Sequence, residues 1–448
     1  MTLLHFRSKV DNLRGYPSGL LIGPSASCAD RTPSRERVGR LLRVSPVSRG
    51  RKPKKSQKKR KPHAAVPRDV ARTPSRMMPA RLADLATRDP TDWWEASHDH
   101  VIGHSAALRD EPGSLELEKA TAELIGGELH AALGREKMGF NMGGWAMQLV
   151  DRAAGRVRRD HDLDALWLIH GVAAIGSYGL GDYAAERAAE VAASLPSAQP
   201  DWLGAVPAVT GGIQVIRDSY GTRLGIIAGF SYPGRAEPVT WLLDIDGGGF
   251  ITIAGAGTFG SPDEAAEAWR SVVGQSAESA VPSAVDADAL MFLAACVQSD
   301  QFVGGRESRS RMDNWYRAYR RLDDIVKALS ERGMELPWER TRTPRTQPVN
   351  PAPMVGEFTA WHAGRRGQAP DAEIVEEVAG EWLDCVVPGT ERLISPTRTT
   401  LFRALIGDWR KPYATPGLDL LTEWVRWLGE ESGLPEALIE HALGGDHG

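Results

Sequence analysis

A dense run of positive side chains carries the clearest chemistry in this sequence. Side chains at this density neutralise phosphates, so the run predicts salt-dependent attraction to nucleic acid or ribonucleoprotein. No aromatic residues are interleaved and no recognition fold surrounds the run, so reading of individual bases is not implied. The nine basic residues that we assign to this nucleic-acid-binding segment are Arg49, Arg51, Lys52, Lys54, Lys55, Lys58, Lys59, Arg60 and Lys61.

The basic run belongs to a chain whose charge is strongly divided. Residues 1–80 contain 20 lysines and arginines against four acidic residues, a net charge of +16, and the remainder carries −20. The composition therefore predicts a basic arm on an acidic body. Other interpretations of the run are a solubilising tail and an arm that folds back on the acidic body. Anionic lipid headgroups are a weaker option, because no amphipathic helix or acylation site lies nearby.

Three histidines close together in the sequence raise the question of a metal site. His100 and His104 would lie one turn apart on one face of a helix, where they could share a divalent ion, and His98 precedes them. No third ligand is evident, since Asp92 and Glu95 fall on other faces of that helix. We therefore predict no cofactor, and keep His100 and His104 only as an alternative metal pair on a polar helix surface.

A glycine pattern further along resembles a dinucleotide-binding motif. Residues 179–184 match GxGxxA, which in such a site follows a strand. The preceding residues 163–175 are rich in alanine and have the length of a helix. The glycines are therefore expected to end one helix and begin the next, with Asp182 as N-cap.

An Asp-rich turn bears a faint likeness to a calcium loop. Asp244 and Asp246 are followed by three glycines, but position 12 of such a loop would be Gly255 and not a glutamate. A hairpin turn accounts for the same residues, so no calcium site is expected.

Arginines cluster before and along a helix expected near residue 320. Arg320 and Arg321 lie off its apolar stripe and are expected to be exposed, with Asp313, Asp323 and Asp324 offsetting the charge. A solvated, ion-paired face is favoured over a phosphate-binding patch. The arginines of this cluster are Arg306, Arg309, Arg311, Arg317, Arg320 and Arg321.

Hydrophobic periodicity, capping residues and breakers predict that most of the chain is helical. Helices are expected over residues 80–88, 91–108, 114–133, 143–158, 162–176, 182–194, 262–273, 286–300, 313–332, 371–387, 396–409, 416–431 and 434–443.

One segment, about 213–257, has β-branched and aromatic runs separated by Asp/Gly turns. This pattern predicts two hairpins, hence one small four-stranded antiparallel sheet packed by helices. The fold class is therefore α+β and mostly α-helical, because the βαβ alternation of a doubly wound parallel sheet is missing.

Composition shifts divide the chain into four regions. Residues 1–79 form a basic N-terminal arm expected to be disordered, because high charge and many prolines leave little apolar surface to bury. Residues 80–338 form a helical region with the sheet, 339–354 a proline-rich linker, and 355–448 a C-terminal helical region. Part of the arm could precede the true start, at Val47 or Met77, which N-terminal mass spectrometry of the native protein would decide.

Hydropathy and cysteine spacing predict a cytoplasmic protein. No run of 18 apolar residues and no signal-peptide core is present, which argues against a membrane span and against secretion. Cys28, Cys296 and Cys385 are far apart and show no CxxC spacing, so disulfides and a thiolate zinc site are not expected. Arginine outnumbers lysine 43 to 11, as in proteins from GC-rich bacterial genomes.

The residues favour a binding function over an enzymatic one. No Ser–His–Asp, Cys–His or paired-carboxylate arrangement is visible by local spacing. The first hypothesis is a non-enzymatic protein whose arm contacts nucleic acid or ribonucleoprotein and whose acidic body binds a protein partner through a surface bearing some of its 14 tryptophans. The alternatives are a metal-dependent enzyme of unknown reaction and a scaffold with a solubilising tail.

Overall fold

The computed structural model describes most of the chain beyond the basic arm. Two compact units are separated, residues 1–72 and 73–448, and every described residue belongs to the second. The helix expected over residues 80–88 lies outside the described residues. Described are residues 92–133, 142–177, 179–193, 195, 200–249, 251–298, 308–337, 350–384, 386, 389–407 and 414–444.

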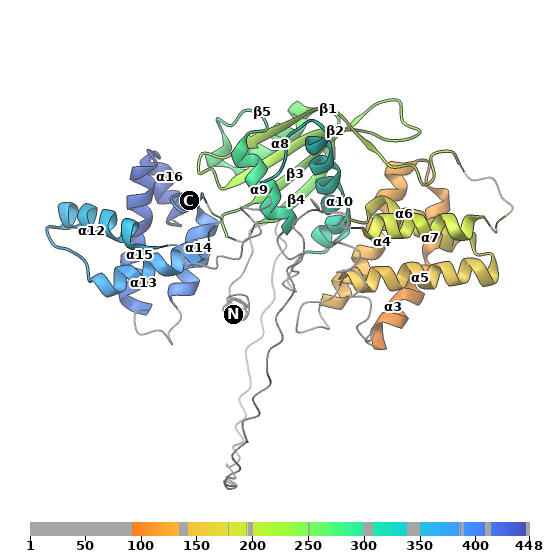
Figure 1. The fold of residues 1–448 in the computed structure, drawn as a ribbon, viewed down its shortest axis with the longest axis horizontal. Coiled ribbons are helices and arrows are strands. Elements are labelled where there is room, and N and C mark those ends of the chain that lie inside the picture. The colour runs from red at the N-terminus through yellow and green to blue at the C-terminus, as the bar shows by residue number, and fades with distance from the viewer. Residues whose placement is uncertain are drawn as a thin grey trace, which may run out of the picture. The chain divides into compact units, whose positions relative to one another are not determined.

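Within the described ranges the strands form a single antiparallel sheet packed by helices, which confirms the α+β class (Figure 1). Its order is β4-β3-β2-β1-β5, so four consecutive strands form a meander and a fifth pairs beside β1. The four predicted strands are present, and the prediction missed only β5, which at two residues is too short to leave a periodic signal. The strands are β1 (Ala208–Arg217), β2 (Arg223–Ser231), β3 (Val239–Asp246), β4 (Thr252–Phe259) and β5 (Ser283–Ala284).

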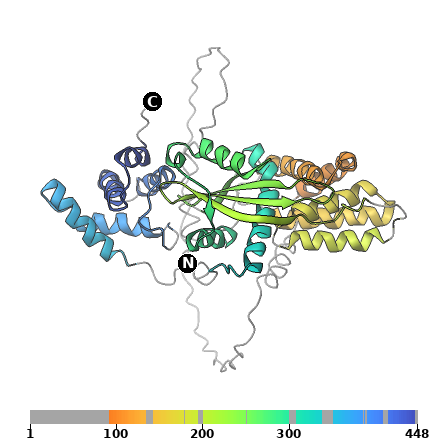
Figure 2. The same cartoon turned by 90° about the horizontal axis from the view of Figure 1, so that it is seen from above.

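Helices cover both faces of the sheet, as Figure 2 shows from above. On one face, Ile216, Ile227 and Leu242 pack with Ala266 and Trp269 of helix α8 (Pro262–Val273). On the other face, residues of β1 to β4 join the large core made with the N-terminal helices and with α10 (Arg309–Glu331). The strands are therefore apolar on both sides, which hides the alternation of a half-exposed sheet.

The N-terminal helices follow the predicted periodicity with two local differences. The helix expected over residues 91–108 ends at Gly103, and a 3-10 helix follows it. The helix expected from Asp182 begins two residues earlier, and its N-cap is Gly179, with a φ of 84°. These elements are α3 (Asp92–Gly103), η3 (Ser105–Asp110), α4 (Ser114–Leu133), α5 (Met142–Asp160), α6 (Leu163–Ile175) and α7 (Leu180–Ala192).

Capping chemistry sets the start of several later helices. Ser261 accepts a hydrogen bond from the Glu264 amide at the start of α8, and Ser395 does the same for the Arg398 amide. Proline at the first helical position fits both starts. Between α8 and α10 lie a 3-10 turn, η4 (Gln275–Ala277), and helix α9 (Ala287–Gln298).

The C-terminal helices enclose a second, aromatic core. Trp382 packs against Phe402 with ring centroids 4.3 Å apart, and Trp424 lies 5.0 Å from both Phe358 and Trp427. The sequence does not predict helix α12, because its first residues lie among the prolines of the expected linker. These helices are α12 (Ala352–Arg366), α13 (Ala372–Asp384), α14 (Pro396–Ile406), α15 (Ala414–Glu431) and α16 (Glu436–Ala442).

Two turns of the sheet contact these C-terminal helices. Tyr220, in the β1–β2 turn, donates a hydrogen bond of 2.7 Å to the Leu438 carbonyl. Arg398, buried at 1% exposure, donates to the carbonyls of Gly247 and Gly248 in the β3–β4 turn and to those of Thr390 and Leu393. The division at residues 339–354 remains a prediction. No helix in the described ranges is long and apolar enough to cross a membrane.

Candidate functional site

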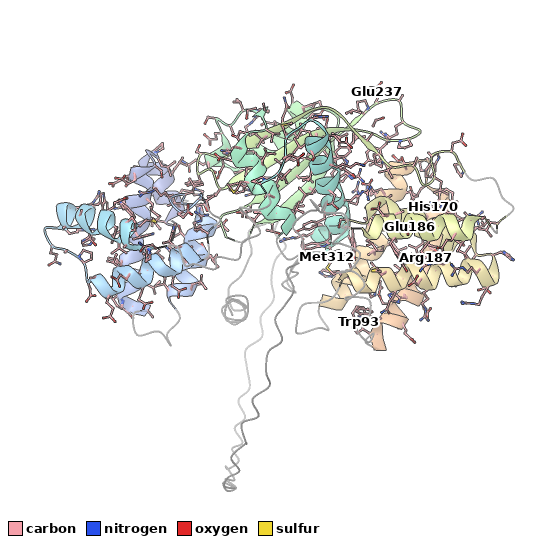
Figure 3. All side chains as sticks on the ribbon, viewed as in Figure 1. Trp93, His170, Glu186, Arg187, Glu237 and Met312 are labelled. Atoms are coloured by element: carbon pink, nitrogen blue, oxygen red, sulfur yellow. The ribbon has the colours of Figure 1, made fainter. Side chains whose placement is uncertain are left out.

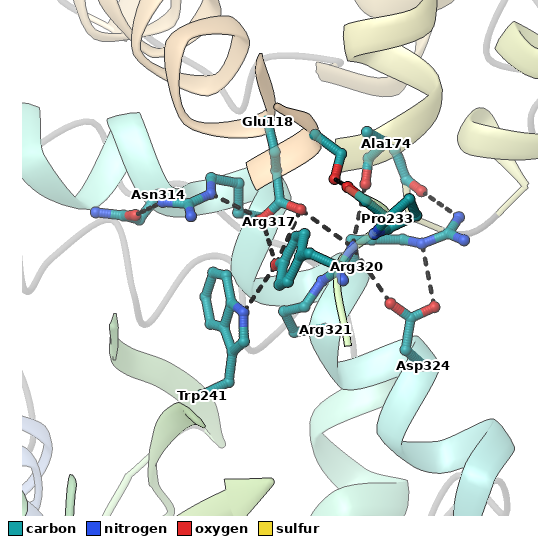
Figure 4. Close-up of polar contacts among 12 residues, drawn as sticks. Glu118, Ala174, Pro233, Trp241, Asn314, Arg317, Arg320, Arg321 and Asp324 are labelled. Atoms are coloured by element: carbon teal, nitrogen blue, oxygen red, sulfur yellow. Dashed lines mark hydrogen bonds and ion pairs between the residues drawn. The ribbon is translucent and has the colours of Figure 1, made fainter. Parts of the chain in front are cut away.

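A buried charge network joins α4, α10 and the sheet. Glu118 of α4 and Arg321 of α10 are both fully buried, and Arg317 is nearly so. The Glu118 carboxylate lies 3.0 Å from Arg317 Nε and 3.5 Å from Arg321 Nη2 (Figure 4). Tyr232, at the end of β2, donates its hydroxyl to the same carboxylate, and Trp241 Nε1 donates to that hydroxyl over 2.9 Å. One carboxylate therefore ties two helices to two strands.

The arginines of α10 also hold the end of α6. Arg320 Nη1 donates to the Gly176 carbonyl over 3.0 Å, and Arg321 Nη2 donates to the Ala174 carbonyl over 3.2 Å. Asp324 lies 3.2 Å from Arg320 Nε and 3.3 Å from Arg321 Nη2. Carbonyls at a helix C-terminus lack an intrahelical partner, so these two side chains satisfy groups that the helix leaves open.

The expected exposure of Arg320 and Arg321 is wrong. Arg321 has no exposed side-chain surface and Arg320 only 15%. The apolar stripe of α10 was assigned from aliphatic and aromatic residues alone, whereas the helix is surrounded by α4, α6 and the sheet on a wider arc. Asp324 offsets their charge as expected, but it does so inside the protein.

Aromatic rings complete the surroundings of the two buried arginines. The guanidinium of Arg317 lies 4.8 Å from the ring centroid of Trp241, and that of Arg321 lies 5.2 Å from Phe230 and 5.9 Å from Tyr232. Ring faces stabilise a guanidinium when water is excluded. Arg321 Nε and Nη1 have no hydrogen-bond acceptor among the described residues, so the rings are the partners of that side of the group.

The side chains of this network hold the surrounding elements together and are poorly suited to proton transfer. Burial raises the pKa of the Tyr232 hydroxyl well above its usual range, and the nearby Glu118 carboxylate adds to the effect. Burial also raises the pKa of Asp324, against the opposing pull of Arg321 and Arg320. Glu118 has both oxygens engaged by donors, which leaves it poorly placed to accept a substrate proton.

One sequence signal could have located this network. Glu118 falls on the buried stripe of α4, in register with Thr121, Ala122 and Ile125. A charge on an apolar stripe must find a partner or stay neutral. The partner lies about 200 residues away, so the sequence predicts that Glu118 has a cationic partner but does not identify which residue it is.

The three histidines take different places. His98 is buried and its Nε2–H donates to the Trp145 carbonyl over 2.9 Å. His100 and His104 are exposed, with ring centroids 4.1 Å apart, and His104 Nδ1 lies 2.8 Å from the His100 carbonyl. Among the residues that the structure describes, no three or more His, Cys, Asp or Glu side chains are grouped to hold a metal ion.

The buried His98 predicts acid sensitivity. Burial lowers its pKa to about 4 from 6.5, so between these values the unfolded chain binds more protons than the folded one. Stability should therefore rise with pH across this window and be fully recovered above pH 6.5, with a loss of about 3 kcal/mol by pH 4. Urea denaturation of the wild type and His98→Gln, which keeps an amide donor for Trp145, measures the difference.

The control for this pH series is His130→Gln. His130 is exposed on α4, so its replacement should leave the pH dependence of the wild type unchanged. If His98→Gln loses as much stability on acidification as the wild type, the assignment to His98 is wrong.

The glycine pattern and the Asp-rich turn are both structural. GxGxxA follows helix α6 and opens α7, as expected, so the strand that a dinucleotide site requires is absent there. Asp244 forms an ion pair of 2.6 Å with Arg223, and Asp246 accepts from the Gly248 amide at the β3–β4 turn. Both carboxylates are engaged by the hairpins that carry them.

Two hollows on the described surface are candidate binding sites. One is a shallow groove of about 350 Å³ between α3 and α5, lined by Glu95, His98, Gln148, Asp151 and Arg152. The second is a narrow cavity of about 40 Å³ among α4, α6, α7 and the segment before β1. Cofactor pockets enclose some 300–1,000 Å³, so the second is far too small for a nucleotide and the first is too open.

The nine basic residues from Arg49 to Lys61 lie outside the described residues, so the geometry of the predicted nucleic-acid-binding segment is not part of this site. Cys296 is buried on α9, where burial raises the pKa of its thiol to about 12, so it is inert.

Comparison of the chain with protein-family models, with curated proteins and with solved structures found no match.

Proposed function

We propose that this is a cytoplasmic, non-enzymatic binding protein whose basic arm contacts nucleic acid or ribonucleoprotein and whose acidic body binds a protein partner. The observation that carries the proposal is the separation of charge, +16 in residues 1–80 against −20 in the remainder. Nine cations within 13 residues attract a polyanion without any folded site.

The described part of the body supports this division of labour. Its arginines are largely committed to carboxylates: Arg152 to Asp99, Arg217 to Asp286, and many others likewise. Paired arginines give little net attraction for phosphate. The arm is therefore the part of the chain suited to a polyanion, and the body is suited to a partner of another kind.

The enzyme hypothesis receives no specific support from the described residues. The buried carboxylate and tyrosine of the charge network are held by their neighbours, and His100 and His104 stand without a third ligand. A scaffold with a solubilising tail differs from our proposal only in the arm, and the deletion below separates the two.

Deleting residues 47–62 is expected to abolish retention of the full-length protein on heparin and on double-stranded DNA at about 50 mM salt, because all nine cations leave together. The wild type should elute with a steep dependence on salt. Column elution and fluorescence anisotropy with labelled DNA measure the change.

The control is a deletion of equal length, residues 15–30, which contains no lysine or arginine. It should bind as the wild type does. Equal binding by the protein without residues 47–62 would overturn the role of the arm and leave the scaffold hypothesis in its place.

A further inference from the structure

The small cavity beside α7 has the form of a receptor for one side chain. Its wall is made of small residues, among them Ala173, Ala174 and Ala185, with Trp202 and Val206 at its rim. Figure 3 labels His170 of α6, which lines it, and Glu186 of α7, which lies one turn beyond Asp182. The hollow is mainly apolar, with a few polar groups around it.

The volume selects the kind of group that fits. A cavity of about 40 Å³ holds roughly three water-sized atoms, at about 10–15 Å³ for each water. This is the size of the end of a leucine, valine or methionine side chain. Gly181, which lines the cavity, lets Arg320 and the Gly176 carbonyl approach α7 closely, because a Cβ there would lie 2.5 Å from Arg320 Nη1 and 2.6 Å from that carbonyl oxygen.

The rim is apolar where a soluble surface is usually polar. Val206 is 51% exposed, one of three large hydrophobic residues so exposed in the described part of the chain. Trp202 is held in place by an edge-to-face contact with Trp167, with ring centroids 5.5 Å apart. A rigid aromatic ring beside an apolar hollow is typical of the centre of a binding surface.

The charge around the cavity indicates the charge that a partner should carry. Asp182 and Glu186 are exposed, lie four residues apart on α7, and have no ion-pair partner among the described residues. Glu190, one turn further, is neutralised by Arg158 and Arg187. The lining cation Arg320 is already held by Gly176 and Asp324. The free charge at this rim is therefore negative.

We propose that this cavity is where the body binds its protein partner, through a peptide segment that inserts one aliphatic side chain flanked by basic residues. The inference rests on the proposed function, since it names the surface and the chemistry of the partner assumed there. The aliphatic group fills the hollow between α6 and α7, and the flanking cations meet Asp182 and Glu186.

The probe is a labelled heptapeptide with one leucine between two pairs of arginines, measured by fluorescence anisotropy on the full-length protein. Ala185→Phe should weaken binding about tenfold, because the new ring fills the mouth of the cavity from an exposed position. Asp182→Asn with Glu186→Gln should weaken it about threefold at 50 mM salt, and by less at 500 mM. A peptide with serine in place of leucine should lose about tenfold.

The matched control is Ala189→Phe, an exposed alanine one turn along α7 that does not line the cavity, and it should bind as the wild type does. Equal affinity of the leucine and serine peptides, or an unchanged affinity in Ala185→Phe, overturns the inference. Heparin retention should be the same in all these variants, so a failure here is distinct from a failure of the arm.

Discussion

Replacing Glu118 with glutamine is expected to lower the free energy of unfolding by about 3 to 5 kcal/mol, the cost of leaving buried charges without their partner. Glu118 is the carboxylate that faces Arg317 at 3.0 Å, and it shares Arg321 with Asp324. Glutamine keeps the size of the side chain and removes only its charge. The loss therefore reports the electrostatics of the network and not a cavity.

The matched control lies one half-turn away on the same helix. Glu116 pairs with Arg235 at 2.8 Å, but both side chains are more than 30% exposed. Glu116→Gln removes the same charge and should cost less than about 1 kcal/mol. Both variants are compared by urea denaturation, and a loss in Glu118→Gln no larger than the control would show that the buried pair is dispensable.

Replacing Arg398 with leucine is expected to lower the free energy of unfolding by a similar amount, about 3 to 5 kcal/mol, for a different reason. Arg398 donates to four carbonyl groups, two of them in the β3–β4 turn, and each buried acceptor left without a donor costs about 1 to 3 kcal/mol. The effect should concentrate where the turn meets the C-terminal helices. Hydrogen exchange should rise at Gly247 and Gly248 and in α14.

The control for this variant is Arg403→Leu on the same helix. Arg403 is exposed and donates to a single carbonyl, that of Leu443, so its loss should change stability by less than about 1 kcal/mol. Unchanged exchange at the β3–β4 turn in Arg398→Leu would mean that the turn is held by other contacts.

Much of the fold follows from local signals in the sequence. Ser261 and Ser395 each precede a proline and each cap a helix as predicted, and Asp/Gly turns place the four strands of the meander. Helix α12 is missed by the sequence analysis because four prolines in residues 339–354 indicate a linker up to the position where the helix begins. Capping residues, prolines and glycines therefore predict that a helix begins nearby more reliably than they predict its first residue.

The polar interior could not be predicted in the same way. Arg321 lies next to the apolar positions of α10, and only the placement of α6 decides that it is buried. The cavity beside α7 is likewise made by segments from residue 114 to residue 320. Periodicity describes one helix at a time, whereas burial of a charge depends on which helix comes to lie against it.

The sheet and the charge network differ in the distance along the chain that their contacts span. Each pair among β1 to β4 joins neighbouring strands, so the meander can assemble while the chain is still being made. The contact between Glu118 and Arg317 spans 199 residues, so it can form only after α10 has been synthesised. We therefore expect this pair to close late in folding, after the sheet has formed. Weakening it should mainly speed unfolding and leave the early rate of folding nearly unchanged.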